Sequence, residues 1–284
     1  MKTLILSDLH LGTGASRGLS YLDGIRTLAR QYDRVILNGD TLDRYEAPAC
    51  EPQSEGLLRQ AREACRGRSA EAELLTGNHD PVISSQQWVY DEASATLVFH
   101  GDCIADMTHP SKRSEQILGA MLSKRWQELG GRPSRFTALA DEHRATQAAY
   151  LKENPRVRER CGAIEYLASV IYPPQKPIHI LQYWSRAPKI VAQLAATFDR
   201  PVRTAVVGHS HRAGNWIHGG MRVINTGSFM PLSTPHAVSI DGSEVQVCSV
   251  RELVRANRAV SMPSSKNPAD SASKRPVSSS EVKA

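Results

Sequence analysis

Short apolar runs alternate with stretches of helical spacing along the first hundred residues and again beyond residue 200. The runs expected to be strands are residues 3–6, 35–37, 73–76, 95–99, 204–207 and 221–224, with alternating runs at 236–240 and 245–250. Helical spacing covers residues 19–32 and about 54–66. Short, fully apolar strands separated by helices are typical of an α/β fold whose sheets are covered on both faces.

Polar residues of three types follow these runs. Asp, Asn or His comes directly after five of them, usually beside a glycine. Ligands of α/β sheets bind outside the carboxyl ends of the strands. Glycine lets the chain turn tightly enough to bring polar side chains back over that edge. The sequence therefore predicts that these residues meet at one site.

The stretch between Asp102 and Pro201 lacks this pattern and predicts a helical insert at about residues 106–200. We expect a helix from Ser111 to about Gly130, one over about 135–152, and a third ending before Pro173. A fourth helix is expected to open at Pro188, and the run at 178–184 fits either a strand or a helix. We expect one domain over residues 1–258 and a disordered tail at 259–284.

Charge is uneven along the chain. The net charge is +6, and residues 106–200 alone carry 15 Lys and Arg against 9 Asp and Glu. A basic insert beside a site can gather an anionic substrate or surface. The alternatives are solvated helix faces, a subdomain that only packs on the rest, or a dimer surface, and the oligomeric state stays open.

Several classes of protein are disfavoured. No apolar run approaches the ~20 residues of a transmembrane segment. The five cysteines are scattered and form no C-x-x-C pair, so we expect free thiols and a cytoplasmic location. Neither a serine nor a cysteine nucleophile motif is present.

The residues after the strands form a set of metal ligands. The candidates are Asp8, His10, Asp40, Asn78, His100, His209 and His211. This set is too large for one tetrahedral ion and lacks the thiolates of structural zinc sites. It suits two divalent ions that share one carboxylate, a pair that clamps the attacking and leaving oxygens of a displacement. We therefore expect metal-bound hydroxide to cleave a phosphoester or diphosphate bond.

Three further residues have expected roles near these ligands. Asp43 is expected to hold His79 protonated and aimed as a general acid for the leaving oxygen. Asp43 as a helix N-cap or turn residue is the alternative. Arg44 is a candidate phosphate clamp, with an exposed surface arginine as the alternative, and Asn78 is expected to contact substrate as well as metal.

Together these motifs resemble those of the calcineurin-like metallophosphoesterase family. The matching blocks are Asp8-x-His10, Gly39-Asp40-x-x-Asp43, Gly77-Asn78-His79-Asp80, His100 and Gly208-His209-x-His211. The resemblance implies an α/β/β/α sandwich, here with the helical insert as a cap. It assigns Asp8, His10, Asp40 and His211 to one metal, and Asp40, Asn78, His100 and His209 to the other. Manganese is expected, with iron, zinc, nickel or cobalt as alternatives.

The layout is also similar to that of the UDP-2,3-diacylglucosamine diphosphatases of lipid A synthesis. The likeness rests on the run from Asp8 to Leu11, on His100-Gly101-Asp102, and on the long insert. His79 departs from it, because those enzymes typically carry arginine at that position. The resemblance implies a nucleotide-lipid substrate, with peripheral membrane contact through the insert, as the alternative to a phosphorylated small molecule.

Two other functions remain as alternatives. A nuclease-like phosphodiesterase is disfavoured because the basic residues lack an aromatic stacking platform. A scaffold of the same fold that only binds partners is disfavoured because every ligand block is intact.

Overall fold

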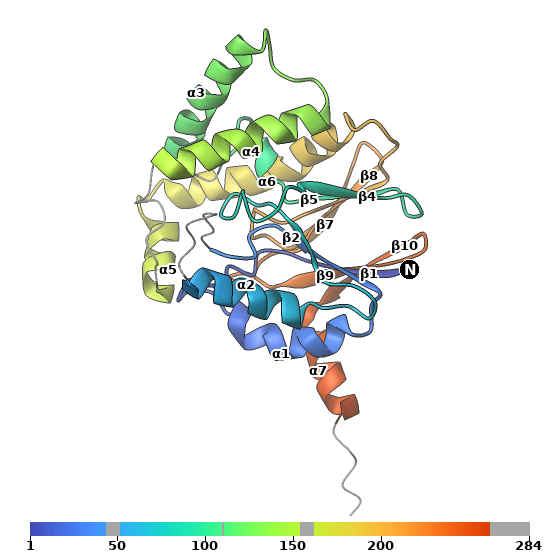
Figure 1. Ribbon diagram of the computed structural model, residues 1–284. Coiled ribbons are helices and arrows are strands. Elements are labelled where there is room, and N and C mark those ends of the chain that lie inside the picture. The colour runs from blue at the N-terminus through green and yellow to red at the C-terminus, as the bar shows by residue number, and fades with distance from the viewer. Residues whose placement is uncertain (44–51, 110, 154–161, 262–284) are drawn as a thin grey trace, which may run out of the picture.

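Two five-stranded sheets lie face to face between helices (Figure 1) in the computed structural model, which describes residues 1–43, 52–109, 111–153 and 162–261. The first sheet contains β1 (Lys2–Leu6), β2 (Arg34–Asn38), β3 (Glu73–Leu75), β9 (His236–Asp241) and β10 (Glu244–Ser249), in the order β10-β9-β1-β2-β3. The second contains β4 (Trp88–Asp91), β5 (Thr96–Phe99), β6 (Thr204–Val207), β7 (Gly214–His218) and β8 (Met221–Asn225), in the order β4-β5-β6-β8-β7.

Helices cover the outer face of each sheet. The first is covered by α1 (Gly18–Ala29), α2 (Pro52–Ala64) and α7 (Val250–Ser261). The second is covered by α4 (Phe136–Glu153) and α6 (Lys176–Ala195), with η1 (Asp102–Ile104) leading into the insert and α5 (Ala163–Ile171) near its end. The predicted α/β/β/α sandwich is confirmed. None of the helices within the described ranges is both long and apolar enough to cross a membrane.

Each central strand is buried on both faces, which explains its continuous apolar sequence. Ile5 of β1 lies between the two sheets with Val206 and Ile224. Its neighbours Leu4 and Leu6 point to the opposite face and pack in the cluster beneath α1. Because successive side chains of a strand alternate between faces, every residue of such a strand must be apolar.

The central strand pairs run parallel. In the first sheet β1 pairs with β2 and β2 with β3, while in the second β5 pairs with β6 and β6 with β8. Their carboxyl ends therefore lie at one edge of each sheet. Asn38 links the two edges, because its Nδ2 donates to the carbonyl of Phe99 at 2.9 Å. The predicted ligands follow these strand ends.

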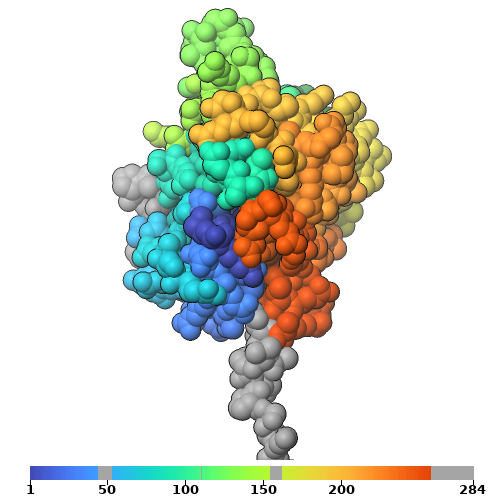
Figure 2. Space-filling view, turned by 90° about the vertical axis from the view of Figure 1, so that its right-hand side faces the viewer, coloured from blue at the N-terminus to red at the C-terminus, as the bar shows by residue number. Residues whose placement is uncertain are grey.

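The insert forms part of the sandwich itself. Phe136 of α4 and Tyr183 of α6 are buried in one cluster with Leu97 and Val207 of the second sheet. The insert helices thus supply the helical layer that this sheet needs for burial. Of the described insert helices, α3 (Lys112–Glu128) projects from the body of the molecule, as Figure 2 also shows.

The expected helix opening at Pro188 is wrong, because Pro188 lies inside α6 and residues 178–184 are helical. Proline has no N–H to donate to the carbonyl four residues earlier, which here belongs to Trp184. Arg212 Nη1 donates to that carbonyl instead, at 3.3 Å. This tertiary hydrogen bond lets the helix continue through the proline.

Three other elements were not predicted. The strands β4 and β7 lie at the two edges of the second sheet, and α7 follows β10 directly. Residues 259–261, expected to open a disordered tail, are the last residues of α7. Residues 262–284 lie outside the described residues.

Candidate metal centre

Five of the predicted ligands have left-handed backbone. Asp8, His10, Asp40, His209 and His211 have φ angles between 47° and 63°. Residues other than glycine seldom adopt this conformation, and each case costs free energy that the surrounding structure must offset. Strain of this kind clusters at functional sites. Here it turns the chain back over the sheet edges directly after β1, β2 and β6.

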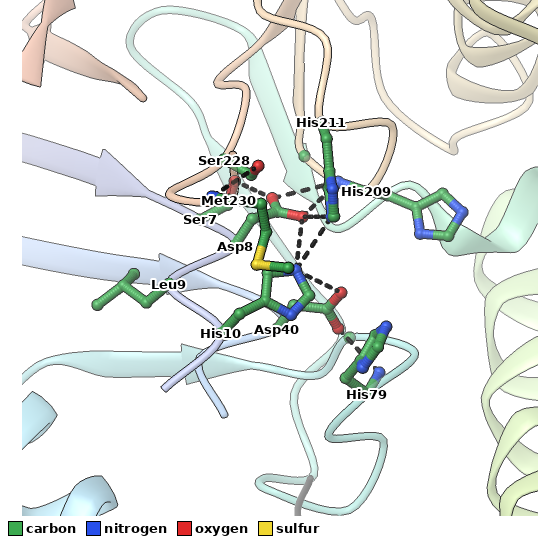
Figure 3. Close-up of polar contacts among 12 residues, drawn as sticks. Ser7, Asp8, Leu9, His10, Asp40, His79, His209, His211, Ser228 and Met230 are labelled. Carbon is green, nitrogen blue, oxygen red and sulfur yellow. Dashed lines mark hydrogen bonds and ion pairs between the residues drawn. The ribbon is translucent and has the colours of Figure 1, made fainter. Parts of the chain in front are cut away.

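Four predicted ligands converge on one point (Figure 3). His10 Nε2 lies 3.0 Å from His211 Nε2 and 3.6 Å from Asp40 Oδ2. Asp8 Oδ1 lies 3.4 Å from His211 Nε2. A metal ion with bonds of about 2.0–2.2 Å holds neighbouring ligand atoms about 3.0–3.5 Å apart. The four side chains therefore fit a single divalent ion.

A second group lies beside the first and shares Asp40 with it. His100 Nε2 is 3.2 Å from Asp40 Oδ2 and 3.2 Å from Asn78 Oδ1. His209 Nδ1 is 2.6 Å from the same Asn78 oxygen. Asp40 Oδ2 is buried and accepts no hydrogen bond from any described residue. A bare carboxylate oxygen in that position is costly unless a cation faces it.

The ionisable side chains of the two ligand groups differ in charge. Burial raises the pKa of Asp40, but the positive charges of His100 and His79 hold it well below its usual range. Burial lowers the pKa of His211 to about 4, and it lowers that of His209 well below the ordinary value. Asp40 is therefore a carboxylate. His209 and His211 are neutral, which is the form that binds metal.

His10 differs from these two histidines. Burial lowers its pKa, but hydrogen bonding to Asp43 and Asp8 and the charge of Asp40 raise it to about 10. Nδ1 of His10 lies 3.1 Å from Asp43 Oδ1, and its Nε2 faces the ligand cluster. This contact between Asp43 and His10 was not predicted, because 33 residues separate the two in sequence and no local pattern connects them.

Asp43 also lies against His79, as predicted. His79 Nδ1 is 3.4 Å from Asp43 Oδ1 and 3.1 Å from the Asp43 carbonyl oxygen. The backbone N–H of His79 donates to Asp40 Oδ1 at 2.9 Å. His79 therefore sits beside the ligand groups, with 39% of its side chain exposed. Arg44 lies outside the described residues.

Asp80 ties two of the ligand loops together. Its buried carboxylate accepts backbone N–H groups of Asp40, Thr41 and Leu42 at 2.8–3.1 Å, and that of Gly77 at 2.9 Å. The residue belongs to the third motif, but no role was predicted for it. The signal available in the sequence was an acidic residue within a ligand motif.

The Asp8 side chain is held by two hydrogen-bond donors and by the close approach of a backbone segment. Ser7 Oγ donates to Asp8 Oδ2 and also hydrogen-bonds Thr226 Oγ1. The backbone N–H of His209 donates to Asp8 Oδ1 at 3.1 Å. Gly208 must lack a side chain, because a Cβ there would overlap Asp8 Oδ2. The glycine of this motif is thus required by close approach.

A cavity of about 350 Å³ opens from the ligand groups toward the insert. Its lining includes Asn78, His79 and His211 from the ligand loops and Lys176 and Ile180 from α6. Among the described lining residues Lys176 is the only lysine or arginine. The cavity is therefore a mostly apolar chamber whose wall carries the ligand side chains and one lysine.

One family of known proteins matches most of the sequence. The sequence matches the Calcineurin-like phosphoesterase superfamily domain over residues 1–241. A comparison with curated proteins finds no match.

Solved structures of similar fold include the following three proteins. Yfce, a phosphoesterase from E. coli, is 12% identical, with 89% of this chain and 95% of that chain covered and a TM-score of 0.41. Wild-type Vps29 complexed with zinc, from Entamoeba histolytica, is 14% identical, with 87% of this chain and 90% of that chain covered and a TM-score of 0.37. A predicted phosphoesterase from Streptococcus pneumoniae is 16% identical, with 88% of this chain and 90% of that chain covered and a TM-score of 0.33. TM-scores this low are no basis for assigning an activity.

The family match ends at the last residue of β9, so it covers every strand that leads into the ligand groups and leaves out β10 at the edge of the first sheet. The chain therefore belongs to the calcineurin-like phosphoesterase superfamily and is a phosphoesterase.

Proposed function

We propose that the chain is a dinuclear metal-dependent hydrolase of a phosphoester or diphosphate bond. The observation that carries this proposal is the position of Asp40 Oδ2. This atom lies 3.6 Å from His10 Nε2 in one ligand group and 3.2 Å from His100 Nε2 in the other. A carboxylate oxygen between two sets of ligands is the arrangement that a bridging ligand requires.

The ligands divide as the family resemblance implies. Asp8, His10, Asp40 and His211 would hold one ion, and Asp40, Asn78, His100 and His209 would hold the other. When bound, the ions would lower the pKa of a shared water molecule and offset the negative charge of the phosphoryl group. The mixed oxygen and nitrogen ligands suit manganese, with iron, zinc, nickel or cobalt as alternatives.

His79 is the proposed general acid. Asp43 fixes its Nδ1, so the second ring nitrogen is the one that gives a proton to the departing oxygen. The support is geometric: His79 lines the cavity and its backbone is anchored to Asp40. Asp43 serves as the positioning residue for this proton transfer.

The proposed substrate is a phosphorylated small molecule with a second anionic group. The apolar cavity would hold its organic part, and Lys176 would bind the second anion. A UDP-2,3-diacylglucosamine diphosphatase-like reaction is the alternative. It is favoured by exposed apolar side chains of the insert, among them Ile164, Ile171 and Leu181, which would also suit peripheral membrane contact.

The test is hydrolysis by manganese-supplemented protein of bis-p-nitrophenyl phosphate, p-nitrophenyl phosphate and a UDP-sugar lipid. We expect turnover of at least one compound, and its loss in Asp40→Asn. Wild-type protein that binds two ions yet turns over none of the three would contradict the proposal. Preference for the UDP-sugar lipid over both generic compounds would select the alternative.

A further inference from the structure

Two buried polar atoms next to the second ligand group lack a partner among the described residues. They are the hydroxyl oxygen of Tyr183 and Nε2 of His209. Tyr183 comes from α6 of the insert and is only 2% exposed. Buried polar groups are nearly always hydrogen-bonded, so two unpaired atoms in the same place call for a common explanation.

Both residues line one small cavity. It has a volume of about 10 Å³, close to the minimum that holds a single water molecule. Trp184, Val207 and Gly101 form other parts of its wall. The rings of Tyr183 and His209 stand nearly perpendicular, with centroids 6.4 Å apart, and no direct hydrogen bond joins them.

The other three ligand histidines show what His209 lacks. Each has a partner on the ring nitrogen that faces away from its ligand group: His10 Nδ1 with Asp43 Oδ1 at 3.1 Å, His100 Nδ1 with the Asn38 carbonyl at 2.9 Å, and His211 Nδ1 with Tyr166 Oη at 3.4 Å. Histidines that bind metal almost always engage the second nitrogen in this way, which fixes the tautomer and the ring orientation.

His209 faces its ligand group through Nδ1, which lies 2.6 Å from Asn78 Oδ1. Its second nitrogen is therefore Nε2, which is buried and belongs to a residue that lines the same cavity as Tyr183. We propose that a single water molecule in this cavity accepts the Nε2–H of His209 and donates to Tyr183 Oη. Tyr183 is then a positioning residue that keeps the Nδ1 lone pair of His209 directed at the second metal ion.

The insert is fastened to the His209 loop at this place. Trp184 Nε1 donates to the Ser210 carbonyl at 2.9 Å, between the two ligand histidines. Arg212 Nη1 donates back to the Trp184 carbonyl that Pro188 leaves without a helical partner. Tyr183 precedes Trp184, so these contacts fix its backbone relative to His209. The inference rests on the proposed two-metal centre and adds that the insert completes it.

The experiment is manganese titration of metal-free Tyr183→Phe by calorimetry. The variant keeps the ring and removes only the hydroxyl. We expect one of the two binding sites to weaken by about 10- to 100-fold while the other keeps its affinity. Thermal unfolding of the metal-free variant should match that of wild type. Tyr32→Phe, which changes a buried tyrosine under α1, is the control that should leave both sites intact.

A second readout separates positioning from packing. Nitrogen NMR of zinc-loaded protein labelled at histidine reports the hydrogen bonding of the His209 Nε2–H, whose signal should move toward that of an unbonded N–H in Tyr183→Phe while the signals of the other ligand histidines keep their positions. Unchanged affinities at both sites, or equal weakening at both with a lower unfolding temperature, would overturn the inference. Wild type that binds fewer than two ions would instead overturn the proposed function.

Discussion

The carboxylate of Asp43 lies 3.4 Å from Nδ1 of His79. The same oxygen atom lies 3.1 Å from Nδ1 of His10. One acidic side chain therefore supports both the proposed general acid and a proposed metal ligand. Burial raises the pKa of Asp43, but its hydrogen bond to His10 and the charge of His79 hold it below the usual value. The two roles of the site are thus coupled through one residue.

Replacing His79 by glutamine should separate catalysis from metal binding. Removal of a general acid should lower kcat by about 10²- to 10⁴-fold. Metal content should stay at about two ions per chain, because neither proposed ligand set includes His79. Steady-state kinetics and elemental analysis of the same preparation check both. Loss of one ion would reassign His79 as a ligand.

Asp43→Asn should affect both roles. The variant should lose kcat to a similar extent as His79→Gln, and it should also bind one ion about 10- to 100-fold more weakly, because the acceptor of His10 loses its negative charge. The double variant should lose little more kcat than either single one, since the two residues act as a unit. Metal affinity equal to that of wild type would show that Asp43 does not support His10.

Lys176→Met should discriminate between substrates. It keeps most of the side-chain length and removes the charge at the cavity wall. We expect kcat/KM to fall by about 10- to 100-fold for a substrate with a second anionic group, and to stay unchanged for bis-p-nitrophenyl phosphate. Lys189→Met, an exposed position on the same helix, is the control. Equal losses for both substrates would mean that Lys176 acts on the scissile phosphate.

The pair formed by Asp106 and His143 should stabilise the insert in a pH-dependent way. Asp106 lies 3.1 Å from His143 Nε2 and 3.1 Å from Arg132 Nη2. Burial raises the pKa of Asp106, but its close ion pair with His143 and the charge of Arg132 leave it below the ordinary 3.8.

The sign of the effect follows from that lowered pKa. Stabilisation by Asp106 should be present above the unfolded-state pKa and should be lost as the pH falls through the lower folded-state pKa. Urea unfolding of wild type and Asp106→Asn should show a difference in free energy of unfolding at about pH 6 that shrinks on acidification. A difference that grew at low pH would contradict the assignment.

The ligand set could be predicted because its signals are local. Asp8, Asp40 and Asn78 each stand within three residues of a strand end, and parallel pairing alone brings such strand ends together. The contact of Asp43 with His10 and the hydrogen bonds that Asp80 accepts from Asp40, Thr41 and Leu42 could not be predicted, because they depend on how loops far apart in sequence face each other.

The insert was harder to predict for a different reason. A helix packed on a sheet and a helix in a separate cap have the same periodicity, so Phe136 and Tyr183 gave no indication of what they pack against. Pro188 opened a predicted helix by a valid local rule. A tertiary hydrogen bond from Arg212 overrode that rule.

The most direct test of the two-metal centre is anomalous diffraction from crystals of the manganese-loaded protein. We predict two peaks about 3.5–4 Å apart, with Asp40 Oδ2 between them. One peak should lie among Asp8, His10 and His211, and the other among Asn78, His100 and His209. A single peak, or peaks that leave Asp40 without a metal contact, would contradict this prediction.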